Sequence, residues 1–255
     1  MPQRSNRRRR RRRGGLAPLL RVMSLLLMAV AIVAALTLFF KVQEIEVVGN
    51  VRYTGEEILE VAQIKPGDNL VLLDKYGISQ RIYTRLPYVT NVSPRRKFPD
   101  KLIVEVTETR AVAAVEGGGS WWLLSSNGKI LEPIERADAG DYMILAGVSA
   151  VEPTAAGWLE LEEETNITTE RLVELLEAME SRDMLGRAQR LDVRDPEKLI
   201  LEYEERFTVE MFYDADFDFK LNCLESAAAQ LEPNEKGILR MTMDDDNEVR
   251  FIPEM

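Results

Sequence analysis

The sequence has no histidine and only one cysteine, Cys223. Histidine is the side chain used most often for acid–base catalysis near neutral pH and for binding zinc or copper. Its absence excludes catalysis by a serine–histidine or cysteine–histidine pair. A single cysteine also excludes an internal disulfide and a cluster of thiolates around a metal, so packing of the core must hold the fold.

Basic residues are scarce outside the N-terminus. The first 21 residues contain nine arginines and no acidic residue, whereas the whole chain has 33 basic and 43 acidic residues, so the remainder has a net charge of about −19. A surface this acidic repels a phosphate backbone, and a nucleic-acid contact would depend on the N-terminal arm alone. We therefore favour other partners over nucleic acid.

Long apolar runs are limited to residues 22–40, VMSLLLMAVAIVAALTLFF, which carry no charge. At 1.5 Å per residue, a helix of this length spans about 28 Å, close to the thickness of a bilayer hydrocarbon core. A cleaved signal peptide is the alternative, but this run exceeds the ~7 to 15 apolar residues of a signal peptide. We expect one uncleaved transmembrane helix and a single-pass protein.

The arginine block lies on the N-terminal side of this apolar run. Lysine and arginine in a short flanking segment are retained in the cytoplasm. We therefore expect a cytoplasmic basic tail at residues 1–21 and about 215 extracytoplasmic residues. The block could also contact anionic lipid. The residues assigned to topology and lipid contact are Arg7, Arg8, Arg9, Arg10, Arg11, Arg12, Arg13 and Arg21.

The segment after the apolar run has the pattern β-α-α-β-β within about 70 residues. VQEIEVVGN alternates as a strand, and a capping box at Thr54 and Glu57 begins a helix. A second helical pattern covers residues 73–86. The two strand patterns YVTNVSPRRKF and KLIVEVTE follow, joined by a turn at Phe98-Pro99-Asp100.

Three parts of this segment together resemble a POTRA domain of the FtsQ/DivIB type, a bacterial cell-division family. They are VQEIEVVGN, the Pro-Gly-Asp-Asn-Leu turn and RLPYVTNVSPRRKFPDKLIVEVTETRAVA. The resemblance covers residues 42–114 in order and spacing, although Val112 stands where a proline is common. It implies a POTRA domain at residues 42–110.

The rest of the chain, residues 111–255, is expected to form a second α+β domain with a mainly antiparallel sheet. AVAAVE, SWWLLS and KILEP are typical of short strands, and AQRLDVRD, KLILEYE and RFTVEMFYD alternate with a period of two. Helical spacing is present from about Thr168 to Arg182 and again from Phe217 to Leu231. GILRMTM and EVRFI close the chain as two further strands.

No catalytic or metal-binding arrangement is recognisable. Most carboxylates fall at polar positions of helices or strands, and none is spaced as a catalytic pair. Asp244 and Asp246 have the spacing of a calcium loop, but that loop needs a glycine and a glutamate where Val249 and Met255 stand. We expect no enzymatic activity, no cofactor, no metal and no small-molecule substrate.

The closing strand is the candidate binding site, because an edge strand offers unpaired N–H and C=O groups to a partner's extended segment. Phe251 could anchor such a contact or belong to the core; the sequence leaves both open. The resemblance implies that FtsB/DivIC-like and FtsL-like bitopic division proteins dock there, and it places Lys220 at the start of the last helix. The candidate residues are Lys220, Asn247, Glu248, Val249, Arg250, Phe251 and Ile252.

The sequence thus predicts a non-enzymatic divisome scaffold at the septum, which recruits other bitopic proteins and links early and late division components. The alternative is a POTRA-type component of polypeptide export or outer-membrane assembly. Such proteins carry a β-barrel, and the sequence lacks a long series of amphipathic strands of about 10 residues. An anchored hydrolase is a third interpretation, which the missing catalytic arrangement disfavours.

Overall fold

The computed structural model describes residues 17–242 and 249–254. The chain divides into two compact units. The first combines the N-terminal part through Glu46 with residues 65–74 and 95–103. The second contains residues 47–64, 75–94 and 104 onward.

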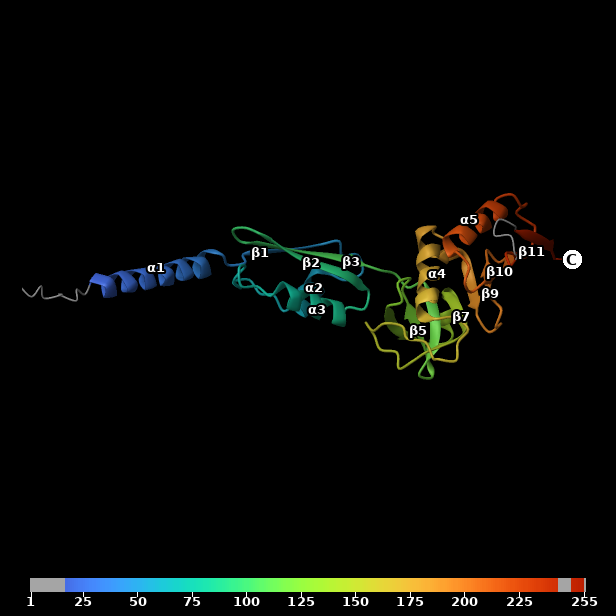
Figure 1. The fold of residues 1–255 in the computed structure, drawn as a ribbon, viewed down its shortest axis with the longest axis horizontal. Coiled ribbons are helices and arrows are strands. Elements are labelled where there is room, and N and C mark those ends of the chain that lie inside the picture. Colours follow the sequence, from blue (N-terminus) through green and yellow to red (C-terminus); the bar gives the residue numbers. More distant parts are fainter. Residues whose placement is uncertain (1–16, 243–248, 255) are drawn as a thin grey trace, which may run out of the picture. The chain divides into compact units, whose positions relative to one another are not determined.

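Helix α1, Ala17–Phe39, is the membrane helix predicted from the apolar run (Figure 1). Its window Leu19–Leu36 has a mean hydropathy of 2.5 and none of its side chains is buried. Within residues 17–242 and 249–254, α1 is the one helix long and apolar enough to cross a membrane. The prediction of a single transmembrane helix is confirmed. Arg21 lies exposed on α1, whereas the block from Arg7 to Arg13 lies outside the described residues.

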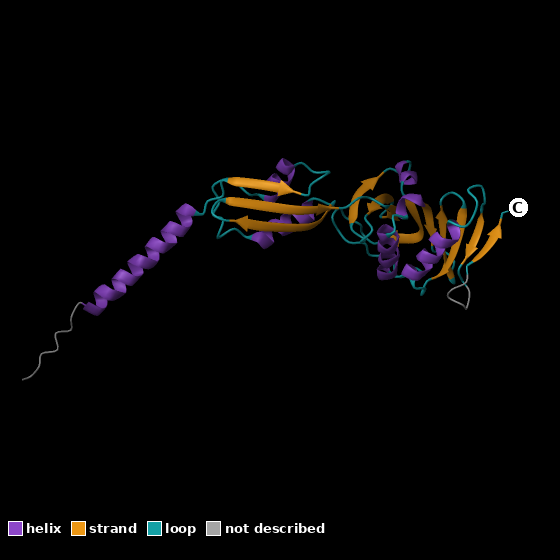
Figure 2. Ribbon diagram, turned by 90° about the horizontal axis from the view of Figure 1, so that it is seen from above, coloured by secondary structure: helices purple, strands orange, loops and turns teal. Residues whose placement is uncertain are grey.

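A three-stranded sheet with the order β1-β3-β2 follows α1. Two helices lie on one of its faces (Figure 2). The predicted order β-α-α-β-β is confirmed. The elements are β1 Glu44–Val48, α2 Gly55–Ala62, α3 Lys75–Arg85, β2 Val89–Lys97 and β3 Lys101–Glu108.

Local signals in the sequence explain where α2 begins. The Thr54 side chain accepts from the Glu57 N–H at 3.2 Å, and the Glu57 carboxylate accepts from the Thr54 N–H at 2.8 Å, so the capping box is formed. Gly49 makes the turn after β1 with φ +85°, and a Cβ there would lie 2.2 Å from the Val106 carbonyl oxygen. Only glycine tolerates both conditions.

The larger sheet has nine strands in the order β12-β11-β10-β9-β8-β7-β4-β5-β6. The pairs β4–β7, β7–β8 and β10–β11 are parallel, and the other five neighbouring pairs are antiparallel. The α+β class with a mainly antiparallel sheet is therefore confirmed. The strands are β4 Ala113–Gly117, β5 Ser120–Leu124, β6 Ile130–Ile134, β7 Met143–Ala150, β8 Ala188–Asp192, β9 Lys198–Tyr203, β10 Phe207–Phe212, β11 Gly237–Arg240 and β12 Arg250–Pro253.

Two helices make the crossovers that parallel pairing requires. Helix α4, Thr169–Ser181, connects β7 to β8, and α5, Phe217–Ala228, connects β10 to β11. Both helices lie beside the larger sheet (Figure 1). The apolar stripes expected from their spacing belong to the main core of that sheet. Short 3-10 helices, Asp138–Asp141 and Leu185–Arg187, precede β7 and β8.

A buried lysine lies in the second unit. The Lys129 side chain is fully buried; its Nζ donates to the Val89 carbonyl at 2.6 Å and to the Tyr83 carbonyl at 3.1 Å. The same Nζ lies 3.9 Å from the centroid of the Tyr83 ring. Burial lowers the pKa of Lys129 to about 8. A neutral amine still has two hydrogens for the two carbonyls, so loss of the proton keeps both hydrogen bonds.

The lowered pKa of Lys129 makes its contribution to stability depend on pH. Between pH 8 and the unfolded value near 10.4, the unfolded chain holds a proton that the folded chain has lost, so the free energy of unfolding rises with pH. Relative to Lys129→Met, we expect the wild-type free energy of unfolding to increase by about 1.5 kcal/mol from pH 8 to pH 9.5. Urea titrations of both full-length proteins in detergent check this, and a difference that does not change with pH would contradict it.

Candidate partner-binding site

Strand β12 is the last strand of the larger sheet, and among the described residues it pairs with β11 alone. The Glu254 N–H donates to the Lys236 carbonyl at 2.8 Å, which marks a hydrogen-bonded antiparallel pair. Such pairs alternate with non-bonded ones, so Phe251 and Pro253 direct their backbone groups away from β11. Pro253 lacks an N–H and fits an outward position. The open edge therefore offers the N–H and C=O of Phe251 and the C=O of Pro253.

Gly237 allows β12 to approach β11 this closely. A Cβ at Gly237 would lie 2.2 Å from the Ile252 carbonyl oxygen and 2.9 Å from the Phe251 ring. Neither neighbour can retreat without moving β12, because one is backbone and the other is an aromatic ring packed against the core. The position of the edge strand thus depends on glycine at the start of β11.

A buried carboxylate ties β11 to the rest of the sheet. Glu210 on β10 accepts from Lys198 Nζ on β9 and from Arg240 Nε on β11, both at 2.7 Å. Burial alone would raise the pKa of Glu210, but the hydrogen bonds and charges of the two cations outweigh burial and lower it. Glu210 is therefore ionised at neutral pH and joins three neighbouring strands.

A groove of about 500 Å³ lies between α5 and the β11–β12 end of the sheet. The Phe251 ring borders it, and the same ring makes an edge-on contact with Phe207 at a centroid distance of 6.4 Å. Phe251 thus contacts the core and the groove at once. The lining residues are Phe219, Asn222, Cys223, Ser226, Ala227, Gln230, Leu231, Leu239, Val249 and Phe251.

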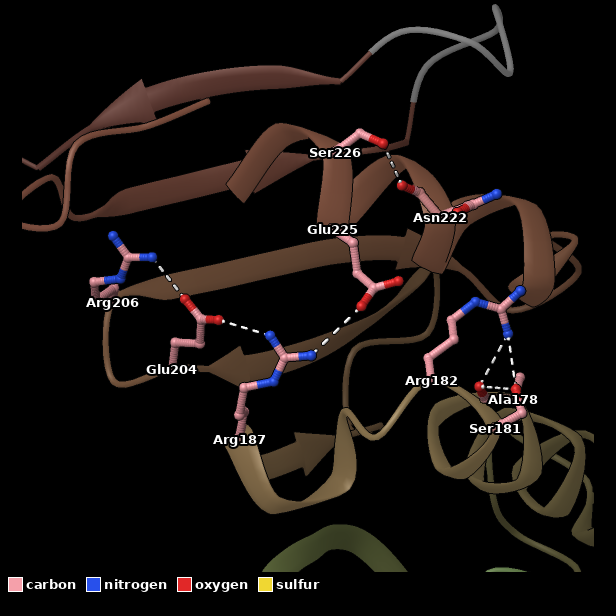
Figure 3. Close-up of polar contacts among 9 residues, drawn as sticks. All are labelled: Ala178, Ser181, Arg182, Arg187, Glu204, Arg206, Asn222, Glu225 and Ser226. Atoms are coloured by element: carbon pink, nitrogen blue, oxygen red, sulfur yellow. Dashed lines mark hydrogen bonds and ion pairs between the residues drawn. The ribbon is translucent and has the colours of Figure 1, made fainter. Parts of the chain in front are cut away.

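Arginines hold α5 over the sheet (Figure 3). Arg187 donates to Glu204 at 3.1 Å and to Glu225 of α5 at 3.4 Å, and Arg206 donates to Glu204 at 2.6 Å. These pairs are partly exposed to solvent, and ion pairs near the surface contribute about 1 kcal/mol or less each. These pairs orient α5. Because Arg187 holds Glu225 on one face of the helix, the next residue, Ser226, lies on the adjacent face that lines the groove.

The first turn of α5 is held in a similar way. Asp216 caps the helix by accepting from the Phe219 N–H at 3.0 Å. Arg171 of α4 donates to the Ala215 carbonyl at 2.6 Å, and its guanidinium lies 4.2 Å from the centroid of the Phe217 ring. The wall of the groove formed by α5 is therefore fixed at both ends.

The structure brings some of the predicted site residues together and separates others. Val249 and Phe251 line the groove. Because side chains alternate along a strand, Arg250 and Ile252 lie on the opposite face of β12. Lys220 is buried, with 3% of its surface exposed, and offers a partner almost no contact area. Asn247 and Glu248, like the calcium-like Asp244–Asp246 spacing, lie outside the described residues.

Sequence reasoning missed the helical wall of the groove. Phe219, Asn222, Cys223 and Ser226 are spaced by three, one and three residues, which places them along one side of α5, and Gln230 follows just after the helix ends. These residues recur with the period of a helix, but most of their side chains are small or polar. A helical pattern is identified from its apolar residues, so this row did not mark a binding surface. In the part of the chain that is described, no group of three or more potential metal ligands occurs.

For the part of the chain that the structure describes, these features define a class: a membrane protein with one spanning helix, a small β-α-α-β-β domain and a larger mixed sheet whose last strand, β12, has a free edge. Residues 40–109 match the family model described as POTRA domain, FtsQ-type. A cell division protein FtsQ of Syntrophotalea carbinolica is 30% identical over 203 residues, which cover 76% of this chain and 67% of the relative. The chain belongs to the FtsQ/DivIB family of cell-division proteins.

Further relatives match over a shorter stretch. FtsQ of Geotalea daltonii is 31% identical over 44% of this chain and 40% of its own length. DivIB of Clostridium acetobutylicum is 29% identical over 44% of each chain. The solved extracytoplasmic domain of DivIB from Geobacillus stearothermophilus aligns at 19% sequence identity, over 50% of this chain and 98% of its own. The TM-score of this alignment is 0.31.

Gly237→Ala tests the dependence of β12 on glycine. The added Cβ would meet the Ile252 carbonyl, so we expect β12 to separate from β11 and the amides of Arg250 and Ile252 to lose at least about tenfold in hydrogen-exchange protection, corresponding to about 1.4 kcal/mol. Gly186→Ala is the matched control, since nothing lies within 4 Å of its Cβ position. Equal protection in both variants would contradict the assignment.

Proposed function

We propose that this chain is a non-enzymatic scaffold of the bacterial divisome. It binds FtsB/DivIC-like and FtsL-like single-span proteins outside the cytoplasm, recruits them to the septum and links early and late division components. The family relationship supports a role in division. The open edge of β12, with the adjoining groove, is the observation that carries the binding role.

Strand addition is the proposed mode of binding. An extended partner segment would pair with the outward N–H and C=O of Phe251, while the carbonyl of Pro253 adds a second acceptor. Because Pro253 has no N–H, the edge supplies few donors in this stretch. The partner's register is therefore set by the pair formed at Phe251.

The groove supplies specificity in this proposal. Phe219 and Phe251 border it on α5 and β12, and aromatic side chains are enriched among the residues that dominate binding energy. A partner segment that continues past the added strand could place apolar side chains between these two rings. Lys220 would then contribute by holding α5 rather than by contact, since it is buried.

The membrane helix completes the proposed mechanism. Association through helices sharing a bilayer depends on close packing of small residues, and α1 contains Ala29, Ala31 and Ala35. Two weak contacts joined by one chain gain effective concentration and can exceed either affinity by 10²–10⁴. A cytoplasmic N-terminus, which the arginine block favours, places the second contact outside the cytoplasm.

The domain limits proposed from the sequence are 1–21, 22–40, 42–110 and 111–255. The match of the family model ends at residue 109, next to the limit between the third and fourth. This agreement supports a domain limit near residue 110, and we propose that the domain after it, residues 111–255 with β12 and α5, binds the partners.

Phe219→Ser tests the groove. Phe219 is 37% exposed, so its loss should leave the fold intact while removing one aromatic border of the groove. We expect the affinity for the FtsB/DivIC-like protein of the same organism to fall at least about tenfold in co-purification and titration of the full-length proteins.

Phe212→Ser is the matched control, because Phe212 is 38% exposed on β10 and does not line the groove. We expect the control to bind as the wild type does. Deletion of residues 247–255 provides a second test, since it removes β12 and with it the proposed pairing edge. Unchanged recovery of the partner after this deletion would refute the docking site.

A further inference from the structure

The first unit joins α1 to the small sheet through hydrogen bonds rather than through a free linker. The Leu70 N–H donates to the Phe40 carbonyl at 2.8 Å, and the Asn69 side chain donates to the Leu36 carbonyl at 3.3 Å. Leu36 is the last residue of the apolar window of α1. Segment 65–74 is therefore held at the end of the lipid-embedded helix.

The β2–β3 turn is fixed to the same place. The Gln43 N–H donates to the Asp100 carbonyl at 2.8 Å. The rings of Phe40 and Phe98 meet edge-on with centroids 5.3 Å apart. Segment 95–103, like segment 65–74, therefore adjoins the end of α1.

Large apolar side chains on these segments are exposed. Phe98 is 58% exposed, Leu72 is 74% exposed, and Phe39 at the end of α1 is 73% exposed. Leu70 and Leu102 of the same segments are fully buried in the core. Leu72 and Phe98 are apolar as well, yet they remain exposed to solvent. Large exposed apolar residues held together at the end of a spanning helix have one surface that is always within reach, the bilayer.

The charges of these segments fit the same surface. Residues 41–46, 65–74 and 95–103 contain six basic and five acidic residues, in contrast to the strongly acidic chain around them. Lys101 lies 2.8 Å from Glu44 and 2.8 Å from Glu46, so these two carboxylates are paired with a cation. Lys65 and Lys97 remain exposed. Lysines flanking apolar side chains can extend to lipid head groups, including anionic ones.

We propose that Leu72 and Phe98, flanked by Lys65 and Lys97, form a lipid-binding surface that inserts into the interfacial layer of the membrane crossed by α1. We name it the juxtamembrane surface. The two apolar side chains enter the boundary between head groups and acyl chains, and the two lysines contact head-group phosphates. The hydrogen bonds to Leu36 and Phe40 hold the surface close to the bilayer, so its effective concentration at the membrane is high. Even a weak affinity for lipid is then enough to keep it inserted for much of the time.

Site-directed spin labelling of the full-length chain tests this surface. In a Cys223→Ser background, nitroxides are attached at Phe98→Cys, Leu72→Cys and, as a control, Val51→Cys, which is 90% exposed in the second unit. The proteins are placed in nanodiscs of phosphatidylcholine with phosphatidylglycerol. We expect the labels at 72 and 98 to be several-fold less accessible to a water-soluble nickel reagent, and more accessible to oxygen, than the label at 51.

A second set keeps the native apolar side chains and places the label at Lys97→Cys. Replacing both anchors, as Leu72→Ser with Phe98→Ser, should raise nickel accessibility at position 97 several-fold, whereas Val51→Ser should not change it. Nickel accessibility at 72 and 98 equal to that at 51 would overturn the proposal and would leave these side chains for a protein occupant. So would an unchanged signal at 97 in the double variant.

Discussion

The contact of the Glu210 carboxylate with Lys198 and Arg240 is the interaction on which the proposed binding end of the protein depends. Strand β11 reaches its place only after the chain has crossed the sheet through α5, and its parallel pairing with β10 has no tight turn to enforce it. The ion pairs across β9, β10 and β11 fix that pairing. Once β11 is in place, Gly237 lets β12 approach it closely. Within residues 17–242 and 249–254, no further strand pairs with β12.

The same arrangement explains why one aromatic residue serves two purposes. Phe251 faces inward from the last strand, so its ring packs against Phe207 while it also borders the groove below α5. Its backbone N–H and C=O, by contrast, point away from β11 within the plane of the sheet. Side chain and backbone of a single residue thus mark the two parts of the proposed site, the groove and the pairing edge.

Much of the fold could be predicted from the sequence, because its signals are local. The apolar run, the capping box at Thr54 and Glu57 and the Phe98-Pro99-Asp100 turn each depend on a few neighbouring residues. The predicted α+β class holds for the same reason. Strand order in the larger sheet could not be predicted, since nothing in β4 or β7 records that they pair in parallel across a connection of more than 20 residues.

The candidate site was predicted only in part. Period-two alternation identified the closing strand but could not assign Phe251 to core or surface, because that depends on the position of α5. Lys220 was named from family resemblance, and its burial follows from the rotation of α5. The α5 wall of the groove was missed, since a row of asparagine, cysteine and serine has no apolar signal. Distant contacts, rather than local propensities, decided each of these outcomes.

The most direct test of the account is hydrogen exchange at the amide of Phe251, measured with and without a saturating FtsB/DivIC-like partner. In the free protein this N–H points away from β11 and should exchange freely, whereas the neighbouring amide of Ile252 is already protected by its bond to β11. Strand addition predicts that the partner slows exchange at Phe251 strongly and at Ile252 little. An amide of Phe251 that still exchanges freely in the saturated complex would contradict the account.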